Sequence, residues 1–384
     1  MRKVIAEKAR LVPAIVLVGI LVFSSLSILS PDQRWTSAPT ISPVSVDSTQ
    51  TALTDEVVDR AVNYLYVNYN NSIGLNYVSP DYPDSDLNST YFIYSDNYLA
   101  SLVLRTYDLS NPTLVGRGEN IKNNYTYYRD RAGANNTTLL PFTNQYRVLS
   151  ENVSDISDSA FHGAEDIDLN ADINLTRLSG ATVRTTINNG DSDLDPKEFA
   201  DIAFLQAIYH KLRDESGAME DYVDGLSSAV NLSDGMGFKD KPFYEHLQKY
   251  NEESYQTYKL ALYIYASRLL RQEDYNRTAF DRALHTLPKM QARNEGISDG
   301  GFSTGYDSSL QAIRGQNGSN GTNTETTSLA VLALSFGEVR EPDSLLAIAA
   351  IVVIALAVIV AVAYFFIRRK RALPPQTPIT PPKT

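Results

Sequence analysis

The sequence contains no cysteine, so the protein forms neither disulfide bonds nor thiolate metal sites. Its histidines have no mutual spacing typical of a metal site; they are His162, His210, His246 and His285. The G-x-S-x-G turn of hydrolases, the phosphate-binding P-loop and the glycine fingerprint of dinucleotide-binding domains are also missing. The fold must therefore rely on the burial of apolar side chains, and no familiar sequence motif announces an activity.

Positive charge is scarce outside the two ends of the chain. The net charge is −11 over 384 residues, while residues 1–10 carry +3 and residues 368–384 carry +5, which leaves −19 for the segment between them. Binding to the phosphates of nucleic acid needs a basic surface, so nucleic acid is excluded as a partner. The apolar content of 43% is that of a folded chain with a sizeable core.

Long apolar segments lie near both ends. Residues 345–367 carry no charge and are long enough to cross a hydrocarbon core of about 30 Å. The basic run 368–371 that follows predicts a cytoplasmic tail, basic and proline-rich, over 368–384. Residues 1–30 combine a basic start with an apolar core and are either a cleaved signal peptide or an uncleaved anchor. We therefore expect a single-pass or double-pass protein of the cell membrane, in contact with the bilayer through 345–367 and with its main domain extracytoplasmic.

Eleven Asn-x-Ser/Thr sequons fall between these apolar segments. They begin at Asn70, Asn88, Asn124, Asn135, Asn136, Asn152, Asn174, Asn231, Asn276, Asn317 and Asn320. Such tripeptides are acceptors for N-glycosylation in proteins exposed outside the cytoplasm. Their density favours a surface glycoprotein.

A repeated unit organises residues 54–338: an amphipathic helix, a glycine turn, a polar loop and an apolar helix. The glycine turns are Gly74-Leu75, Gly235-Met236-Gly237-Phe238 and Asp299-Gly300-Gly301-Phe302, and the apolar helices that follow them are expected at 95–107, 255–270 and 324–336. A fourth apolar helix is expected at 195–212, and amphipathic helices at 55–69, 219–230 and 280–287. Repeated helical hairpins bury their apolar faces on one another, which predicts a mainly α, two-layer α/α domain.

Two segments interrupt this rhythm. Residues 31–53 are rich in Ser, Thr and Pro without periodicity, which is typical of a linker. Within residues 109–194, the segment 166–175 alternates at strand period and 182–187 is β-branched up to an Asn-Gly turn. We interpret 109–194 as a β-containing insertion.

The third repeat resembles the DGGF and T-x-x-A-L-x-A-L repeats of α/α-toroid proteins, such as terpene cyclases, protein prenyltransferases and related six-hairpin enzymes. The resemblance implies an α/α toroid with a concave surface where the inner helices begin. About seven helices are expected here, against the twelve of a closed six-hairpin toroid, so the toroid is incomplete. Neither the acid motif of the cyclases nor the zinc ligands of the prenyltransferases has a counterpart, so neither activity is implied.

The polar residues at the starts of the apolar helices are the candidate site, because these starts would converge on that surface. The catalytic candidates are Asp96, Glu198 and Glu325, with Asp201 beside Glu198, and the ligand-binding candidates are Tyr94, Asn97, Tyr255, Lys259, Thr324 and Asp299. Paired carboxylates on separate hairpins could serve as general acid and base on a glycoside. The alternative is helix capping, since polar residues satisfy the free N–H groups at every helix start.

No cofactor is predicted, although Asp191, Asp193 and Asp195 have the alternate spacing of a calcium loop. Three oxygens fall short of the six to eight ligands that calcium takes, and the glycine and glutamate of an EF-hand are missing.

These features predict a membrane-anchored cell-surface protein whose α/α domain binds an extracytoplasmic polymer or partner, such as a glycan or an envelope protein. One alternative is a glycan-cleaving enzyme, either a glycoside hydrolase or a polysaccharide lyase, that uses paired carboxylates at the inner-helix starts. A second alternative is a structural glycoprotein of the envelope.

Overall fold

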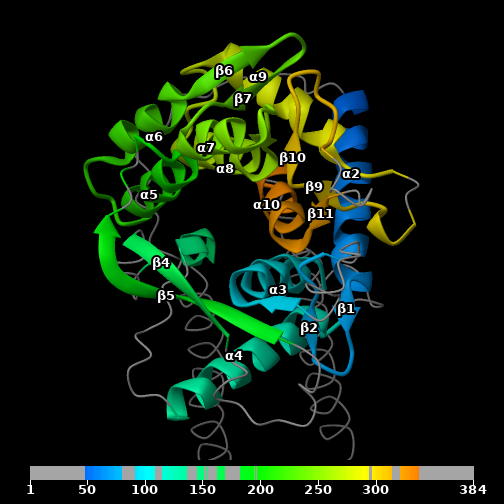
Figure 1. Cartoon of the computed structure of the whole chain (residues 1–384). Helices are drawn as coiled ribbons and strands as arrows, with labels where there is room; N and C mark the ends of the chain where they lie inside the picture. Colours follow the sequence, from blue (N-terminus) through cyan, green and yellow to red (C-terminus); the bar gives the residue numbers. More distant parts are fainter. Residues whose placement is uncertain are drawn as a thin grey trace, which may run out of the picture. The chain divides into compact units, whose positions relative to one another are not determined.

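The computed structural model describes residues 48–79, 91–108, 115–135, 145–150, 153, 162–168, 182–193, 195, 197–293, 296–313 and 321–336. These residues are mainly helical, with five small sheets of two or three strands (Figure 1). The chain divides into two units, Met1–Ser48 and Thr49–Thr384, and the description that follows concerns the second.

The expected membrane segments, residues 1–30 and 345–367, lie outside the described residues. Among the helices that are described, none is both long enough and apolar enough to cross a bilayer. Membrane anchoring therefore stays a prediction from the sequence.

Four helices form an inner set in which each contacts the next (Figure 1). They are α3 (Tyr94–Asp108), α5 (Ala200–Leu212), α8 (Thr257–Leu270) and α10 (Thr324–Leu334). The contacts run from α3 to α10, from α10 to α8 and from α8 to α5. The short 3-10 helix η1 (Gln145–Ser150) contacts both α5 and α3, so the succession of contacts returns to its start. Helices α8 and α10 are buried on nearly all sides, as their apolar patterns predict.

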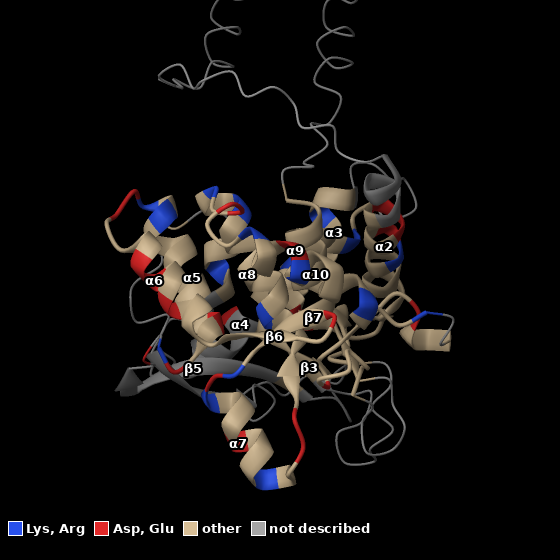
Figure 2. Ribbon diagram, turned by 90° about the horizontal axis from the view of Figure 1, so that it is seen from above, with Lys and Arg blue, Asp and Glu red and all other residues tan. Residues whose placement is uncertain are grey.

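Half-buried helices pack against this inner set from outside. Helix α4 (Arg117–Asn135) packs on α3, α6 (Ala218–Ser227) on α5, and α9 (Arg277–Thr286) on α8. Helix α2 (Ser48–Val67) ends beside the start of α10, where Asn68 donates a hydrogen bond of 2.8 Å to the hydroxyl of Thr324. Helix α7 (Lys241–Tyr250) projects from the other helices (Figure 2).

Helices α4 and α7 were not among the expected elements. Helix α4 is rich in Asn, Arg and Tyr, which hides the stripe that it buries at Ile121, Tyr125 and Tyr128. This spacing of four and three residues is that of one helix face, so the signal was present in aromatic form. Helix α4 is therefore an outer helix that packs on α3, within the segment expected to be a β-containing insertion.

Several boundaries also differ from expectation. Helix α2 begins at Ser48, inside the expected linker, because no proline or glycine after Pro43 stops a helix from extending toward the N-terminus. Helix α5 begins at Ala200, not at Asp195. The expected helix 219–230 ends at Ser227, and its last apolar residues belong to strand β6 (Ala229–Leu232).

The insertion contains a three-stranded sheet. Strand β5 (Thr182–Asp193) pairs with β4 (His162–Asp168) in antiparallel fashion and with β3 (Tyr91–Ile93) in parallel fashion. The expected turn at residues 189–190 is wrong, because β5 continues through it. The register shifts at this point, so the glycine is accommodated in an irregularity of the strand and does not end it.

The three glycine turns occupy positions where a helix or ring leaves no room for a side chain. A Cβ atom on Gly300 would lie 2.2 Å from the carbonyl oxygen of Arg60 in α2, and one on Gly237 would lie 2.3 Å from the ring of Tyr255. At Gly74 it would meet the Asn124 side chain in α4 at 2.3 Å. Gly300 and Gly74 also have positive φ angles, which glycine tolerates best.

Short strand pairs join the glycine turns to the helix starts. Strand β9 (Phe302–Ser303) pairs with β11 (Thr322–Asn323) just before α10, and β10 (Gly305–Tyr306) pairs with β8 (Tyr255–Gln256) just before α8. The hydroxyl of Tyr306 reaches the carbonyl of Met236 in β7 (Gly235–Phe238), and the hydroxyl of Thr324 reaches the carbonyl of Tyr77, next to β2 (Leu75–Asn76). The three turns are therefore connected along one edge, where α8 and α10 begin.

The opposite end of α10 is held by Arg268 of α8. Its guanidinium donates hydrogen bonds of 2.6 Å and 2.9 Å to the carbonyls of Ala333 and Leu334. These are carbonyls that have no partner within the helix, so Arg268 caps α10 from outside.

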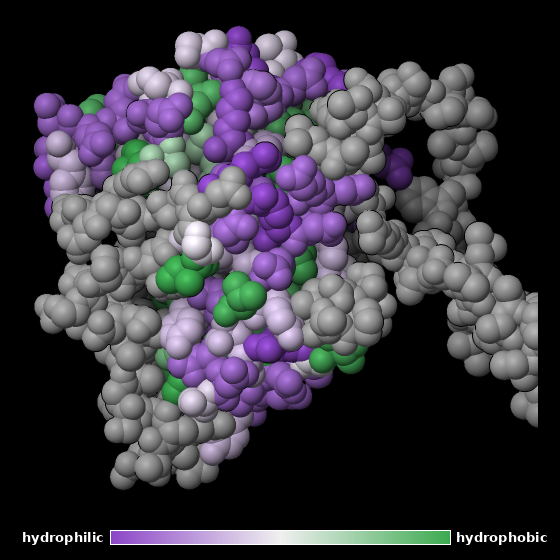
Figure 3. Space-filling model, turned by 90° about the vertical axis from the view of Figure 1, so that its right-hand side faces the viewer, coloured by the Kyte–Doolittle hydropathy of each residue, from purple (hydrophilic) through white to green (hydrophobic). Residues whose placement is uncertain are grey.

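Elsewhere on the described surface, the side that carries α2 is mostly hydrophilic, with apolar residues in small separate patches (Figure 3).

Candidate functional site

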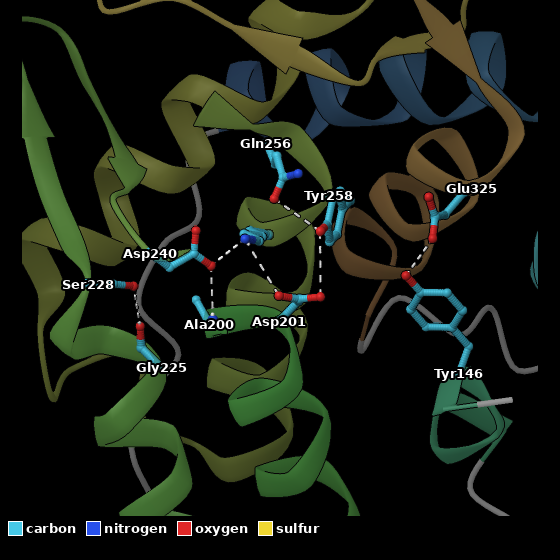
Figure 4. A network of polar contacts seen from close by, with 10 residues as sticks. Tyr146, Ala200, Asp201, Gly225, Ser228, Asp240, Gln256, Tyr258 and Glu325 are labelled. Atoms are coloured by element: carbon cyan, nitrogen blue, oxygen red, sulfur yellow. Dashed lines mark hydrogen bonds and ion pairs between the residues drawn. The ribbon is translucent and has the colours of Figure 1, made fainter. Parts of the chain in front are cut away.

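The starts of the inner helices bring acidic and phenolic side chains together (Figure 4). The group comprises Asp96 of α3, Asp201 of α5, Tyr258 of α8, Glu325 of α10 and Tyr146 of η1, and we call these five residues the acid cluster. They come from five elements spread over 230 positions of the sequence, and each is linked to another member by a hydrogen bond or by the effect of its charge.

The pKa values of two carboxyl groups in the acid cluster are raised by burial and by a neighbouring carboxyl group. Asp96 is 3% exposed, and burial together with the charge of Glu325 raises its pKa well above the ordinary 3.8. Burial and the charge of Asp201 also raise the pKa of Glu325. Among the described residues, no Lys or Arg forms an ion pair with either group. Both carboxyls are therefore biased toward holding a proton, and Asp96 more strongly.

A hydrogen bond from Tyr146 gives Glu325 a different environment from that of Asp96. Its hydroxyl donates a hydrogen bond of 2.5 Å to Oε1 of Glu325, and this bond lowers the pKa of Glu325. Among the described residues, the Ser95 hydroxyl, at 3.3 Å, is the only side-chain donor to Asp96. The bond from Tyr146 thus offsets part of the rise in the pKa of Glu325, and Asp96 holds its proton more strongly than Glu325. Burial and the neighbouring Glu325 raise the pKa of the Tyr146 hydroxyl well above 10.0, so it remains a donor.

Asp201 is held from one side by a buried cation. The ammonium of Lys259 lies 3.6 Å from Oδ1 of Asp201 and forms a closer ion pair with Asp240. The side chains of Lys259 and Asp240 are each 1% exposed. Asp240 also accepts a hydrogen bond of 3.1 Å from the N–H of Ala200 and so caps α5, whose own N-cap position is Phe199. This arrangement fixes the start of α5, and with it the position of Asp201.

Tyr258 lies between Asp201 and Gln256 (Figure 4). Its hydroxyl is 3.1 Å from Oε1 of Gln256 and 3.5 Å from Oδ2 of Asp201. Burial, followed by the charges of Asp201 and Glu325, raises the pKa of the hydroxyl well above 10.0. Tyr258 is therefore a second neutral O–H donor in the acid cluster.

Several candidate residues serve to hold the backbone at the same edge. The Asn97 amide donates to the carbonyls of Asn76 and Ile93 and accepts from the N–H of Asn76, so it fastens β2 to the start of α3. Thr324 accepts from Asn68 and donates to the carbonyl of Tyr77. Both side chains are buried in these contacts.

Two candidate tyrosines pack in the core. Tyr94 is buried against the ring of Tyr125, with the ring centres 4.9 Å apart. Tyr255 is 1% exposed and packs on Phe243 and Tyr306. Their rings fill space between helices, and Tyr146 and Tyr258 are the tyrosines that join the acid cluster.

Two candidate acids lie elsewhere. Asp299 forms an ion pair with Arg60 of α2, which fixes the third glycine turn on the outer helix. Glu198 precedes α5 and forms an exposed ion pair of 2.7 Å with Lys241. Asp195 does not cap α5, since it accepts from the N–H of Lys197 in a turn that comes before the helix.

The described residues contain no group of three or more His, Asp or Glu side chains that could hold a metal ion. Asp191 and Asp193 lie at the end of β5, and the carboxylate of Asp195 is used in the turn with Lys197. The acid cluster therefore provides proton-transfer groups and hydrogen-bond donors rather than a cation cage.

Comparison with protein-family models, with curated proteins and with solved structures finds no match to this chain. The function is accordingly inferred from the geometry and chemistry of the acid cluster.

Three residues of this region were not among the candidate residues: Tyr146, Tyr258 and Asp240. Tyr146 comes from η1 within the insertion, where no periodicity marks it. Asp240 had a usable signal, because Asp240-Lys241-Pro242 places a capping residue before a proline in the first helical turn. Its partner Lys259 was found only as a polar residue at a helix start.

Proposed function

We propose that this protein is a membrane-anchored, extracytoplasmic enzyme that cleaves glycosidic bonds in a carbohydrate polymer, with Asp96 and Glu325 as its acid and base. One observation carries the proposal: two buried carboxyl groups lie at the starts of different inner helices without an ion pair to a described Lys or Arg, and the charge of Glu325 favours the protonated form of Asp96. Burial of such groups is unfavourable, and pairs of this kind are concentrated where proton transfer is needed.

The difference between the two environments assigns the roles. Asp96 retains a proton and is the general acid that donates to the oxygen of the leaving sugar. The Tyr146 hydroxyl offsets part of the rise in the pKa of Glu325, so Glu325 loses its proton more readily than Asp96 and is the general base. Sugars are rich in hydroxyl groups, and Oδ1 of Asp201 is an acceptor for them. We place Glu198, Asp299, Tyr94 and Tyr255 outside this site.

The fold that we propose is an incomplete α/α toroid. It is supported by the closed succession of contacts among the inner helices and by the half-buried helices outside them. The extracytoplasmic address is supported by the apolar segment 345–367, the basic residues after it and the sequons between the two ends. An acid–base site in this location would act on polymers of the cell surface or its surroundings.

The test uses the full-length protein in detergent with a panel of soluble polysaccharides. We expect new reducing or unsaturated sugar ends, and we expect Asp96→Asn and Glu325→Gln each to lower the rate at least a hundredfold. Asp274→Asn, which changes an exposed carboxylate in the loop before α9, is the matched control and should leave the rate unchanged. If the protein binds a polymer without cleaving it, the acid cluster is a binding surface and the catalytic proposal fails. If it neither binds nor cleaves, a structural envelope role is favoured.

A further inference from the structure

The charges around the acid cluster are mostly negative. Carboxyl groups come from Asp96, Asp201, Asp240 and Glu325, whereas Lys259 is the only described Lys or Arg that forms an ion pair with any of them. The Lys259 ammonium is 1% exposed and is already engaged by Asp240 and Asp201. Four carboxyl groups thus surround one ammonium that is already paired, so the site offers no unpaired cation to an anionic ligand.

The unused polar atoms are acceptors. Oδ1 of Asp201 is buried and has no hydrogen-bond partner among the described residues, although Lys259 lies 3.6 Å away. Asp201 as a whole is 8% exposed. A buried acceptor without a donor is unfavourable unless a bound molecule supplies the donor. Sugar hydroxyls are such donors, whereas a carboxylate, sulfate or phosphate brings only further acceptors.

Cleavage of an acidic sugar by elimination would also need an available cation in the site. It removes a proton next to a carboxylate and places developing negative charge on that group, which a cation must stabilise. Lys259 is buried and paired, so it is not placed for this task. An acidic sugar would also bring an anion to a buried site whose one described cation is already paired with carboxyl groups, which is unfavourable.

We infer that the acid cluster takes uncharged sugar units and cleaves them by hydrolysis, and that it discriminates against polymers of uronic acids and against sulfated or phosphorylated glycans. This inference rests on the proposed function. In the reaction, Asp96 gives its proton to the oxygen of the leaving sugar as the bond from that oxygen to the anomeric carbon breaks. Water forms the new bond to the anomeric carbon and gives a proton to Glu325. Glu325 then releases this proton to solvent and Asp96 takes one up from solvent, so both groups return to their starting states.

The experiment compares matched polymers on the full-length protein: a neutral galactan with a galacturonan, and a neutral glucan derivative with its carboxymethylated counterpart. Reducing ends report hydrolysis, and the ultraviolet absorbance of unsaturated products reports elimination. We expect reducing ends from at least one neutral polymer, at a rate at least tenfold above that of its acidic counterpart. Unsaturated products, or faster cleavage of the acidic member of each pair, overturn the inference while leaving glycan cleavage intact. Cleavage of no polymer means that the proposed function itself has failed.

A variant tests the electrostatic cause. Asp201→Asn removes one negative charge and releases part of the attraction on Lys259, so we expect the ratio of acidic to neutral oligosaccharide affinity to rise about tenfold. Asp274→Asn removes an exposed charge and should leave this ratio unchanged. Binding measured by calorimetry or thermal shift keeps the test valid if the variant loses catalysis, and circular dichroism checks that it folds. An unchanged ratio in folded Asp201→Asn contradicts the electrostatic argument.

Discussion

The Tyr146 hydroxyl donates a hydrogen bond of 2.5 Å to Oε1 of Glu325, although the two residues are 179 positions apart. This bond joins the insertion to the inner helices at the acid cluster. It also stabilises the charged form of Glu325 and so lowers its pKa. The chemistry of the base therefore depends on a segment that has no place in the helical repeat.

Replacing Tyr146 by phenylalanine removes this donor and keeps the ring. The pKa of Glu325 then rises, so the base is ionised only at higher pH. We expect the acidic limb of the pH–rate profile to move upward by roughly one pH unit, because a hydrogen bond to a charged group contributes about 1.5–3 kcal/mol and one unit corresponds to about 1.4 kcal/mol. Tyr244→Phe, at an exposed position in α7, is the control and should not move the limb. A limb that stays in place in Tyr146→Phe would show that the bond does not tune Glu325.

The Asp96 carboxyl should make the protein less stable as the pH rises. Its pKa is raised in the folded state, because of burial and the charge of Glu325, so the folded protein binds this proton more tightly than the unfolded chain. The corresponding stability is fully present below the ordinary pKa of 3.8 and is lost as the pH rises through the folded-state pKa.

Asparagine resembles the protonated acid and does not ionise. We therefore expect Asp96→Asn to stabilise the protein at neutral pH by about 0.5–2 kcal/mol while abolishing cleavage. The advantage should disappear near pH 4, where the wild-type carboxyl is protonated in both states. Thermal unfolding between pH 4 and pH 8 measures the difference. A variant that is less stable than the wild type throughout this range would contradict the assigned protonation.

Replacing only one partner of the Lys259–Asp240 ion pair should lower the stability of the protein strongly. Lys259→Met leaves Asp240 and Asp201 buried without a cation, and we expect a loss of about 3–5 kcal/mol in the free energy of unfolding. Adding Asp240→Asn removes one uncompensated charge and retains an acceptor for the N–H of Ala200, so part of the loss should be recovered. Chemical denaturation of the wild type, both single variants and the double variant gives the coupling. Strictly additive losses would mean that the two side chains do not stabilise one another.

Substitutions at Gly296 and Gly300 measure the stability cost of backbone strain separately from that of steric conflict. Gly296 and Gly300 both have positive φ, but a Cβ atom on Gly296 meets nothing within 4 Å, whereas one on Gly300 meets the backbone of Arg60 at 2.2 Å. We expect Gly296→Ala to cost about 1–2 kcal/mol through the left-handed backbone alone. Gly300→Ala should cost a further 1–3 kcal/mol, roughly, because α2 must move away. Equal losses of stability would show that the close approach of α2 is unimportant.

The sequence was most informative where burial decides the structure. Helices α8 and α10 are apolar on nearly all sides, and the glycine turns before them mark close contacts with neighbouring elements. Asp96 and Glu325 could be chosen because they lie in the first turns of inner helices. The effect of Glu325 on Asp96 could not be derived, since it depends on how α3 and α10 pack.

Glu198 illustrates how a helix boundary changes a site. A start near residue 195 would have placed Glu198 in the first turn of α5, but the helix begins at Ala200, where Asp240 provides the cap. The inward carboxylate is then Asp201, only three positions later. Because Asp240 is distant from α5 in the sequence, the local pattern does not reveal this cap. The local pattern therefore favoured Glu198 over Asp201 as the member of the acid cluster.

Helix α10 has Glu325 in its first turn and the cap from Arg268 at its last. It is 11 residues long, which corresponds to roughly 16 Å. The chain continues from the capped end toward the segment expected to lie in the bilayer, so Glu325 sits a full helix length from that exit. If that segment anchors the protein as we propose, the base lies at the end of α10 that is farther from the anchor along the chain, and we expect free polymer strands rather than lipid-attached sugars as substrates.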